Sequence, residues 1–231
     1  MKNIVVFTGA GISQESGIQT FRDATDGLYA DHELEKVVTV EGFKDSPKLV
    51  MDFHNVLRNK IKDKKPNIAH RLLAELENDF NVTIITQNVD NLHELAGSTN
   101  VLHLHGELNK AREIGDNDKI YDCGNDLNYG DVGPNGMFLR PHTVLFGEMP
   151  FNVDESYEAL DNADYLIVIG TSLNIGYTVP MLGGAKEDVK VFYIDPKPSK
   201  DLEYYFYKIE YIKSKASIGV KKLYNILKKD E

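Results

Sequence analysis

The chain has 231 residues, of which 42% are hydrophobic and 27% are charged, and its formal net charge is −10. These values are typical of a folded globular protein that is long enough for one large domain with a small inserted module. The acidic charge argues against nucleic-acid binding, which needs clustered Lys and Arg. It favours a basic partner such as a lysine-rich peptide, although solubility alone would also account for it.

The single cysteine, Cys123, can form neither an intramolecular disulfide nor a metal site with several thiolate ligands. One free thiol suits a reducing compartment. The first ten residues are predicted to be a strand and a glycine turn, and no apolar segment has the length of a membrane span. We therefore expect a cytoplasmic protein without a signal peptide, which binds neither nucleic acid nor membrane.

Four short apolar segments are predicted to be buried strands, because each is rich in β-branched or aromatic residues and ends in small or polar ones. They are residues 4–7, 82–85, 165–169 and 191–194. Helical periodicity is predicted over residues 46–62, 67–80, 154–162 and 218–229. This alternation predicts an α/β fold with a doubly wound, Rossmann-like parallel sheet and a small inserted module.

Two stretches interrupt the alternation. Residues 107–137 are rich in Gly, Asn and Asp and are expected to form a small inserted module or an extended loop layer. Residues 23–40 are expected to be irregular and to act as a mobile lid. We expect a single domain, residues 1–231, with two lobes. The large lobe is expected at about 1–25, 80–106 and 139–231, and the small-lobe insertions at about 26–79 and 107–138.

All four predicted strands end in polar or glycine-rich residues. Ligands of such sheets bind beyond the carboxyl ends of the strands, so these ends predict one shared crevice. The residues concerned are Gly9, Ala10 and Gly11; Thr86, Gln87 and Asn88; Gly170, Thr171 and Ser172; and Asp195 and Pro196.

The glycine turn at residues 9–13 predicts a phosphate-binding loop or, equally well, a tight strand-to-helix turn. Its spacing lacks the third glycine of the usual dinucleotide fingerprint. Arg22, which follows Thr20 and Phe21, can reach a phosphate or a ribose. It can also form a surface ion pair with Asp23 or Asp26.

Gln87, Asn88 and Asp90 place two amides and a carboxylate directly after a strand. Such a cluster is costly to bury without partners and can bind a carboxamide such as nicotinamide. The alternative is that Asn88 or Asp90 caps the helix that follows. His93, inside that helix, is expected to be structural.

His105, which precedes Gly106, is a candidate general base, because histidine titrates near neutral pH. Taken alone, it is more often an ordinary core or surface histidine. His103 and His105 share one face of a strand, but no third His or Cys lies nearby at a usable spacing. We therefore predict no metal at this pair.

Together these segments resemble the sirtuins, which are NAD⁺-dependent protein deacylases. The resemblance covers nearly the whole chain and is carried by an ordered series of blocks. They are residues 9–13, 16–18 and 20–22; 86–90, 92–93 and 96–97; 104–106; 139–141 and 146–148; 170–173; and 194–195.

The resemblance implies that His105, with Asn88, catalyses transfer of an acyl group from lysine to ADP-ribose. The products would be nicotinamide, O-acyl-ADP-ribose and free lysine. Mono-ADP-ribosyl transfer and NAD hydrolysis at the same site remain alternatives. The implied NAD contacts are Gly9, Ala10, Gly11, Ile12, Ser13, Gly17, Ile18, Thr20, Phe21, Arg22, Gln87, Asn88, Asp90, Gly170, Thr171, Ser172, Asp195 and Ala216.

The resemblance also implies that an acyl-lysine protein or peptide is the substrate and adds as a strand beside residues 144–148. Val144 and Phe146 would line a tunnel for the lysine side chain. The implied substrate contacts are Val144, Phe146, Gly147, Glu148, His54 and Leu57.

Three departures from the family pattern change these expectations. Most sirtuins hold a structural zinc with four cysteines, whereas this chain has only Cys123 in that region. We therefore expect a metal-free module that is held by packing and hydrogen bonds. Tyr121 and Tyr129 are candidates for these contacts. Gln19 replaces a frequent proline, and residues 174–180 form a longer turn than usual. Both changes are expected to shift loops of the cofactor site.

The third departure concerns the acyl group. Sirtuins that prefer succinyl or malonyl lysine carry a Tyr and an Arg three residues apart, where this chain has His54 and Leu57. Without that pair a negatively charged acyl group lacks a bidentate partner, so acetyl or longer uncharged groups are expected. Arg58 lies about 100° further around the helix. The alternative is that the alignment is off by one and Arg58 turns inward.

Overall fold

The computed structural model describes residues 1–19 and 31–229, without the side chains of 31–33 and 116–118. Its larger sheet has six strands in the order β3-β2-β1-β7-β8-β9, and every neighbouring pair is parallel. Strand order therefore reverses between β1 and β7, and this pair forms the topological switch point of a doubly wound sheet. The strands are β1 (Asn3–Thr8), β2 (Asn81–Thr86), β3 (Val101–His103), β7 (Tyr165–Ile169), β8 (Lys190–Ile194) and β9 (Ile209–Ile212).

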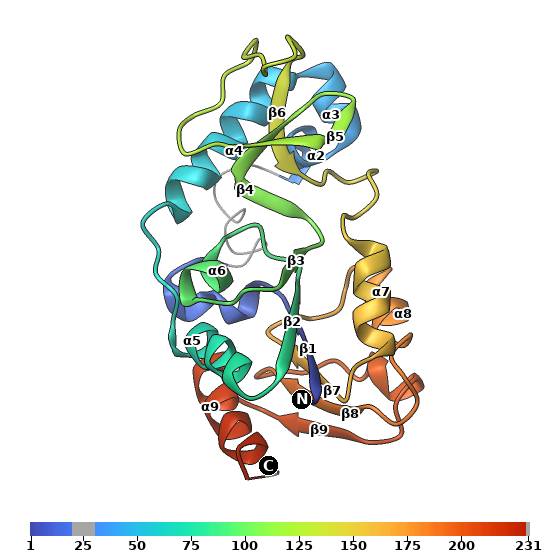
Figure 1. Cartoon of the computed structure of the whole chain (residues 1–231). Helices are drawn as coiled ribbons and strands as arrows, with labels where there is room; N and C mark the ends of the chain where they lie inside the picture. The colour runs from blue at the N-terminus through green and yellow to red at the C-terminus, as the bar shows by residue number, and fades with distance from the viewer. Residues whose placement is uncertain (20–30, 230–231) are drawn as a thin grey trace.

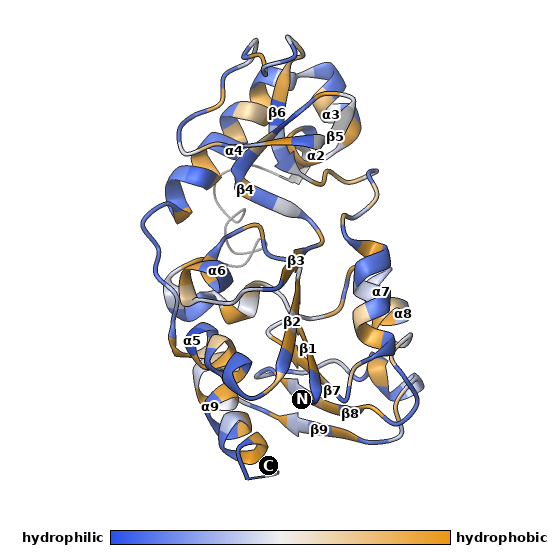
Figure 2. Cartoon of the chain, in the orientation of Figure 1, coloured by the Kyte–Doolittle hydropathy of each residue, from blue (hydrophilic) through white to orange (hydrophobic). Residues whose placement is uncertain are grey.

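Both faces of this sheet are covered by helices, as its all-apolar strands require. Ile4 and Val6 of β1 face a core shared with α5 (Ile68–Glu75) and α9 (Ala216–Leu227). Val5 and Phe7 face a second core shared with α7 (Val153–Asp161) and α8 (Thr178–Leu182). Figure 1 shows the two pairs of helices on opposite sides of the sheet, and Figure 2 shows the hydrophobic colouring of β7 and β8 between them.

The segment that leads into α5 joins this helix to the glycine turn after β1. Asn67 accepts a hydrogen bond from the Ala69 amide and forms a reciprocal capping box with His70. The Asn67 side-chain amide also donates to the Ile12 carbonyl and to the Ser16 hydroxyl. One polar side chain thus starts a helix and fixes the turn that faces the crevice.

A second lobe lies at the other end of the molecule (Figure 1). Its antiparallel sheet has the order β5-β4-β6 and packs against α4, which in turn contacts α2 and α3. The elements are β4 (Gly106–Glu113), β5 (Asp116–Asp122), β6 (Leu139–Thr143), α2 (Asp31–Val38), α3 (Val40–Asp45) and α4 (Pro47–Ile61). The short helix α6 (Leu92–Ala96) lies in the large lobe, between β2 and β3 in sequence.

Polar contacts hold much of this small lobe together. The Asn55 side chain donates to the Leu127 carbonyl and accepts from the Leu127 amide, which ties α4 to residues 123–138. Glu148 accepts from both Arg112 and Arg140 and pairs with both. Among the described residues, the apolar cluster of this lobe is a small one around Met51, Ala111 and Leu127, so these hydrogen bonds and ion pairs add to its cohesion.

The four expected strands and four expected helices are confirmed, with ends that differ by up to five residues. Two expectations are wrong in part. Residues 107–137 belong to a small module as expected, but they contain most of β4 and all of β5 rather than a loop layer, because their polar residues hid the strand pattern. Residues 31–40 include the helix α2 and the start of α3 rather than an irregular lid. The rest of that segment, up to residue 30, lies outside the described residues.

The expected lobe boundaries also need correction. β6 pairs with β4 and so belongs to the small lobe, whereas α5 packs on the large sheet through Ala69 and Leu73. Sequence order alone could not separate these segments, because the chain crosses between the lobes several times. None of the helices within residues 31–229 is long and apolar enough to cross a membrane.

Candidate active site

Two glycine turns interlock at the carboxyl ends of β1 and β7, where the sequence predicts the shared site. The Gly9 amide donates to the Ile169 carbonyl, and the Gly11 amide donates to the Gly170 carbonyl at 2.8 Å. A Cβ atom on Gly11 would lie 2.6 Å from the Gly170 Cα, and one on Gly170, where φ is +60°, would lie 2.5 Å from the Ile12 nitrogen. These positions therefore need glycine because one backbone packs directly on the other.

This arrangement changes the expected role of the turn. The amides of Gly9, Gly11, Ile12 and Ser13 all donate to backbone carbonyls of the protein. The segment forms two single-turn 3-10 helices, Ala10–Ile12 and Gln14–Ser16. The turn thus offers a ligand close approach to the backbone rather than a row of free amide donors.

Three polar side chains converge beside this turn. The Ser13 hydroxyl donates to Asp90 Oδ2 at 3.0 Å, and the Asn88 side-chain amide donates to the Gly9 carbonyl at 3.2 Å and lies 3.3 Å from the Ser13 hydroxyl. All three side chains are buried. The amide and carboxylate that follow β2 therefore face the glycine turn that follows β1.

The alternative role of Asp90 as a helix cap is also realised. Its Oδ1 accepts from the Leu92 amide at the start of α6, while Oδ2 faces Ser13. Burial raises the pKa of Asp90, against the opposing effect of its hydrogen bonds with Leu92 and Ser13. A carboxyl group held in this way can still accept a further hydrogen bond at each oxygen.

His105 has a defined tautomer. Its Nδ1 lies 2.9 Å from the Gln87 carbonyl, which can only accept, so Nδ1 carries the proton. Burial lowers the pKa of His105, and the Gln87 hydrogen bond only partly offsets this. The neutral ring then presents its lone pair at Nε2, where it accepts from the Tyr177 hydroxyl at 2.6 Å. His105 is therefore poised as a general base.

The end of β7 connects to the same segment. The Thr171 hydroxyl donates to the Gln87 side-chain carbonyl at 2.9 Å and accepts from the Leu173 amide. The Thr171 carbonyl accepts from the buried Tyr193 hydroxyl. Gln87 is thus fixed through its backbone by His105 and through its side chain by Thr171.

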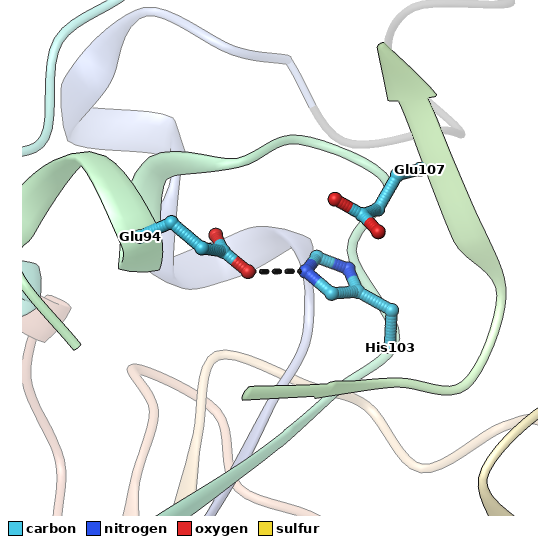
Figure 3. A group of neighbouring side chains, drawn as sticks. All are labelled: Glu94, His103 and Glu107. Atoms are coloured by element: carbon cyan, nitrogen blue, oxygen red, sulfur yellow. Dashed lines mark hydrogen bonds and ion pairs between the residues drawn. The ribbon is translucent and has the colours of Figure 1, made fainter. Parts of the chain in front are cut away.

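Figure 3 shows a second polar group beside the site, formed by Glu94, His103 and Glu107. His103 Nδ1 lies 2.9 Å from the Asn88 carbonyl, and Nε2 lies 2.8 Å from Glu94. Burial would lower the pKa of His103, but the hydrogen bond and charge of Glu94 and the charge of Glu107 raise it. The pair His103 and His105 thus donates to the carbonyls of two consecutive residues.

These three side chains are of types that ligate divalent cations, and their ligand atoms lie within 4.8 Å of one another. Each already has a partner in the protein, however. His103 pairs with Glu94, and Glu107 pairs with Lys110 at 2.6 Å. The His103 ring lies beside two carboxylates, whose charges favour its protonated form, and the Lys110 ammonium pairs with one of them.

Other residues expected around NAD are placed as follows. Ile12 is fully buried in the core, and Ala216 is buried at the start of α9. The amide and hydroxyl of Ser217 donate to the Glu15 carboxylate, which fixes this end of α9. Gly17 has a left-handed φ of 78°, Ile18 and Asp195 are half-buried, and Ser172 is exposed. Thr20, Phe21 and Arg22 lie outside the described residues.

The expected peptide-binding stretch begins next to the base, because the Val144 amide donates to the His105 carbonyl. Phe146 is 56% exposed, and its backbone pairs with Val38 and Val40, so that edge is already taken by the protein. Gly147 is exposed with a φ of +101°. The Glu148 carboxylate is held by two arginines and the Leu145 amide, which gives it a structural role.

The two residues expected to select the acyl group differ in their surroundings. His54 is buried between the Val50 carbonyl and the Thr143 hydroxyl, and Leu57 is half-buried. Arg58 does turn into the lobe, but it donates to the Leu108 carbonyl and to Asn55. The bond to Leu108 holds α4 against β4, and Arg58 Nη2 has no hydrogen-bond partner among the described residues.

Sequence analysis missed Tyr177 as a neighbour of the base. No motif marks this residue, and only the unusual length of residues 174–180 set the segment apart. It also missed Thr8, whose hydroxyl donates to Thr86 and lies 3.1 Å from the His93 ring.

The two histidines are expected to titrate in opposite directions. In a histidine NMR titration, the pKa of His103 should lie above 6.5 and that of His105 below it. Replacement Glu94→Gln should lower the pKa of His103 and leave that of His105 nearly unchanged, because only His103 contacts Glu94. Equal pKa values for the two rings would contradict this account of the site.

Comparison with known proteins agrees with this geometry. The model of the Sir2 family matches residues 9–176. An NAD-dependent protein deacylase of Aggregatibacter actinomycetemcomitans is 48% identical over 84% of this chain and 93% of its own length. Another from Bacteroides thetaiotaomicron is 42% identical over 98% of both.

Solved structures give the same result. A Sir2 homologue in complex with NAD superposes with a TM-score of 0.84, at 31% identity, over 99% of this chain and 90% of the other. A Sir2 variant with a deacetylated p53 peptide and 3′-O-acetyl-ADP-ribose gives 0.77, at 25% identity, over 97% and 93%. The family model matches more than half of the chain and these relatives cover most of it, so the chain belongs to the Sir2 family.

Proposed function

We propose that this chain is an NAD-dependent protein-lysine deacylase that prefers uncharged acyl groups such as acetyl. The observation that carries the proposal is the neutral His105, whose Nε2 accepts a hydrogen bond beside Asn88, Asp90 and the interlocked glycine turns. The names of the relatives with 42–48% identity support the same activity. The products are nicotinamide, O-acyl-ADP-ribose and free lysine.

The residues of the crevice fit NAD. Asp90 and Asn88 offer an acceptor and an amide to the nicotinamide carboxamide from one buried cluster. At the end of β8, Asp195 Oδ1 accepts from the Lys197 amide, and Oδ2 has no protein donor among the described residues, so it can accept from a ribose hydroxyl. When bound, NAD supplies the ribose carbon that the acyl oxygen attacks as nicotinamide leaves.

The protein's own part in the reaction is proton transfer and positioning. His105 Nε2 takes the proton of a ribose hydroxyl, so that this oxygen can attack the acyl carbon. The charge that the ring then gains is stabilised by the Gln87 carbonyl, to which Nδ1 already donates. Because Thr171 holds the Gln87 side chain, this carbonyl is fixed before substrate binds.

The acyl-lysine substrate is proposed to run along residues 144–148 on the side that Val38 and Val40 leave free. The exposed Gly147, next to the exposed Phe146 ring, gives a peptide backbone room to approach. Val144 joins this stretch to the His105 carbonyl. A lysine side chain entering beside it would bring its acyl group toward the base.

His105→Ala should lower deacylation of an acetyl-lysine peptide by about 100-fold or more, because the general base is lost. Mass spectrometry of the products checks the proposal directly, and unchanged thermal unfolding of the variant shows that the fold is intact. Formation of ADP-ribosylated protein, or of ADP-ribose without any acyl transfer, would instead identify an ADP-ribosyltransferase or an NAD hydrolase.

The acyl preference is proposed to follow from Leu57 and His54. Leu57→Arg should raise the ratio of kcat/KM for succinyl-lysine over acetyl-lysine by about tenfold, since one charge-assisted hydrogen bond becomes available. Val56→Arg is the matched control. Val56 is 42% exposed on the same helix, so this variant introduces the same charge one position away from Leu57. If both variants change the ratio equally, Leu57 does not face the acyl group.

The small lobe is proposed to be stable without metal. Asn55→Ala should lower the free energy of unfolding by about 2–4 kcal/mol, because it removes three hydrogen bonds: it leaves the buried Leu127 amide and carbonyl unpaired and takes an acceptor from Arg58. Asn59→Ala, which removes one exposed hydrogen bond to Asp126, should cost under about 1 kcal/mol.

Urea unfolding measures both variants. The wild-type curve should be the same with and without EDTA, and a large shift with EDTA would show that a metal supports the lobe. The single thiol, Cys123, is the observation that supports both this proposal and a cytoplasmic location.

A further inference from the structure

The Tyr177 hydroxyl occupies the same nitrogen that the proposed reaction needs. It lies 2.6 Å from His105 Nε2, and the two rings meet edge-on with their planes at 90°. The His105 Nδ1 proton is committed to the Gln87 carbonyl, so Nε2 has the only lone pair on the ring. That lone pair accepts one strong hydrogen bond, and the ribose hydroxyl cannot form it while Tyr177 does.

Tyr177 is held in this position by the fold rather than by chance contact. It precedes α8, and the buried Thr178 hydroxyl donates to the Ile175 carbonyl and contacts the Leu173 carbonyl, which closes the loop beneath the tyrosine. Its ring packs against the core on the α8 side of the sheet. Burial raises the pKa of Tyr177, so the phenol is a neutral donor.

The same loop has room to release the tyrosine. A Cβ on Gly176 would meet no atom within 4 Å among the described residues, so the backbone just before Tyr177 borders open space. The Leu173 φ of 57° shows that the loop leaves β7 through an unusual turn. Tyr177 therefore lies between the anchored start of α8 and Gly176, whose backbone borders open space.

We propose that Tyr177 is a positioning residue, a displaceable placeholder that holds His105 ready in the free enzyme and yields Nε2 to the ribose hydroxyl when substrate binds. The placeholder keeps water from the base, while the Gln87 carbonyl keeps the ring in one orientation. This proposal rests on the deacylase function proposed above. It predicts that the Tyr177 contact is present before binding and absent in the reacting complex.

Tyr177→Phe keeps the ring and removes the hydroxyl. Because no hydrogen bond to Tyr177 then has to be broken, KM for NAD should fall and kcat/KM should rise by about two- to tenfold, with kcat nearly unchanged. Tyr211→Phe is the matched control, since it removes an exposed hydroxyl that bonds to Glu203 far from the base. It should leave both constants unchanged.

A readout independent of turnover separates this proposal from the proposed function. In ¹⁵N NMR, the Nε2 signal of His105 should differ between the free wild type and free Tyr177→Phe. The difference should disappear when NAD and an acyl-lysine peptide analogue are bound. The signal is assigned with His105→Ala, and thermal unfolding checks that each variant folds.

The outcomes are distinct. A fall in kcat for Tyr177→Phe would make Tyr177 part of the chemistry and overturn the placeholder. Identical Nε2 signals in the two free proteins would also overturn the placeholder. Failure of the wild type to deacylate any peptide would instead contradict the proposed function. The NMR comparison of the free proteins would still test the contact between Tyr177 and His105.

Discussion

The hydrogen bond from His105 Nδ1 to the Gln87 carbonyl is the interaction on which the site depends. It decides which ring nitrogen is protonated, and therefore which one can act as a base. The carbonyl is fixed because Gln87 follows β2, whose neighbour β3 leads into His105. Sheet pairing thus sets the tautomer of a side chain, and the chemistry follows from backbone geometry.

The neighbouring His103 repeats the contact with the opposite electrostatic result. Residues 103 and 105 point to one side of the chain, so both rings reach the segment after β2, at Asn88 and Gln87. His103 meets Glu94, which favours its charged form, whereas the second nitrogen of His105 meets a neutral phenol. Two histidines, one at the end of β3 and one just beyond it, therefore have pKa values shifted in opposite directions, raised for His103 and lowered for His105.

The small lobe shows how a module with one cysteine is held together. Asn55 fixes residues 123–138 through both backbone groups of Leu127, and Tyr121 donates to Glu113. Tyr129, the other tyrosine expected to contribute, is 63% exposed. These contacts come from side chains on three different elements, so they depend on the lobe being assembled and not on any local sequence motif.

The sequence by itself determined the apolar strands, the helices between them and the polar strand ends, because burial imposes period and composition locally. It also carried the family blocks around His105. Only the tertiary structure decided that β6 leaves the large lobe, that Glu148 is tied up by two arginines and that Tyr177 reaches the base. Those contacts join residues 8 to 72 positions apart, and no local pattern encodes which distant partner a polar side chain will meet.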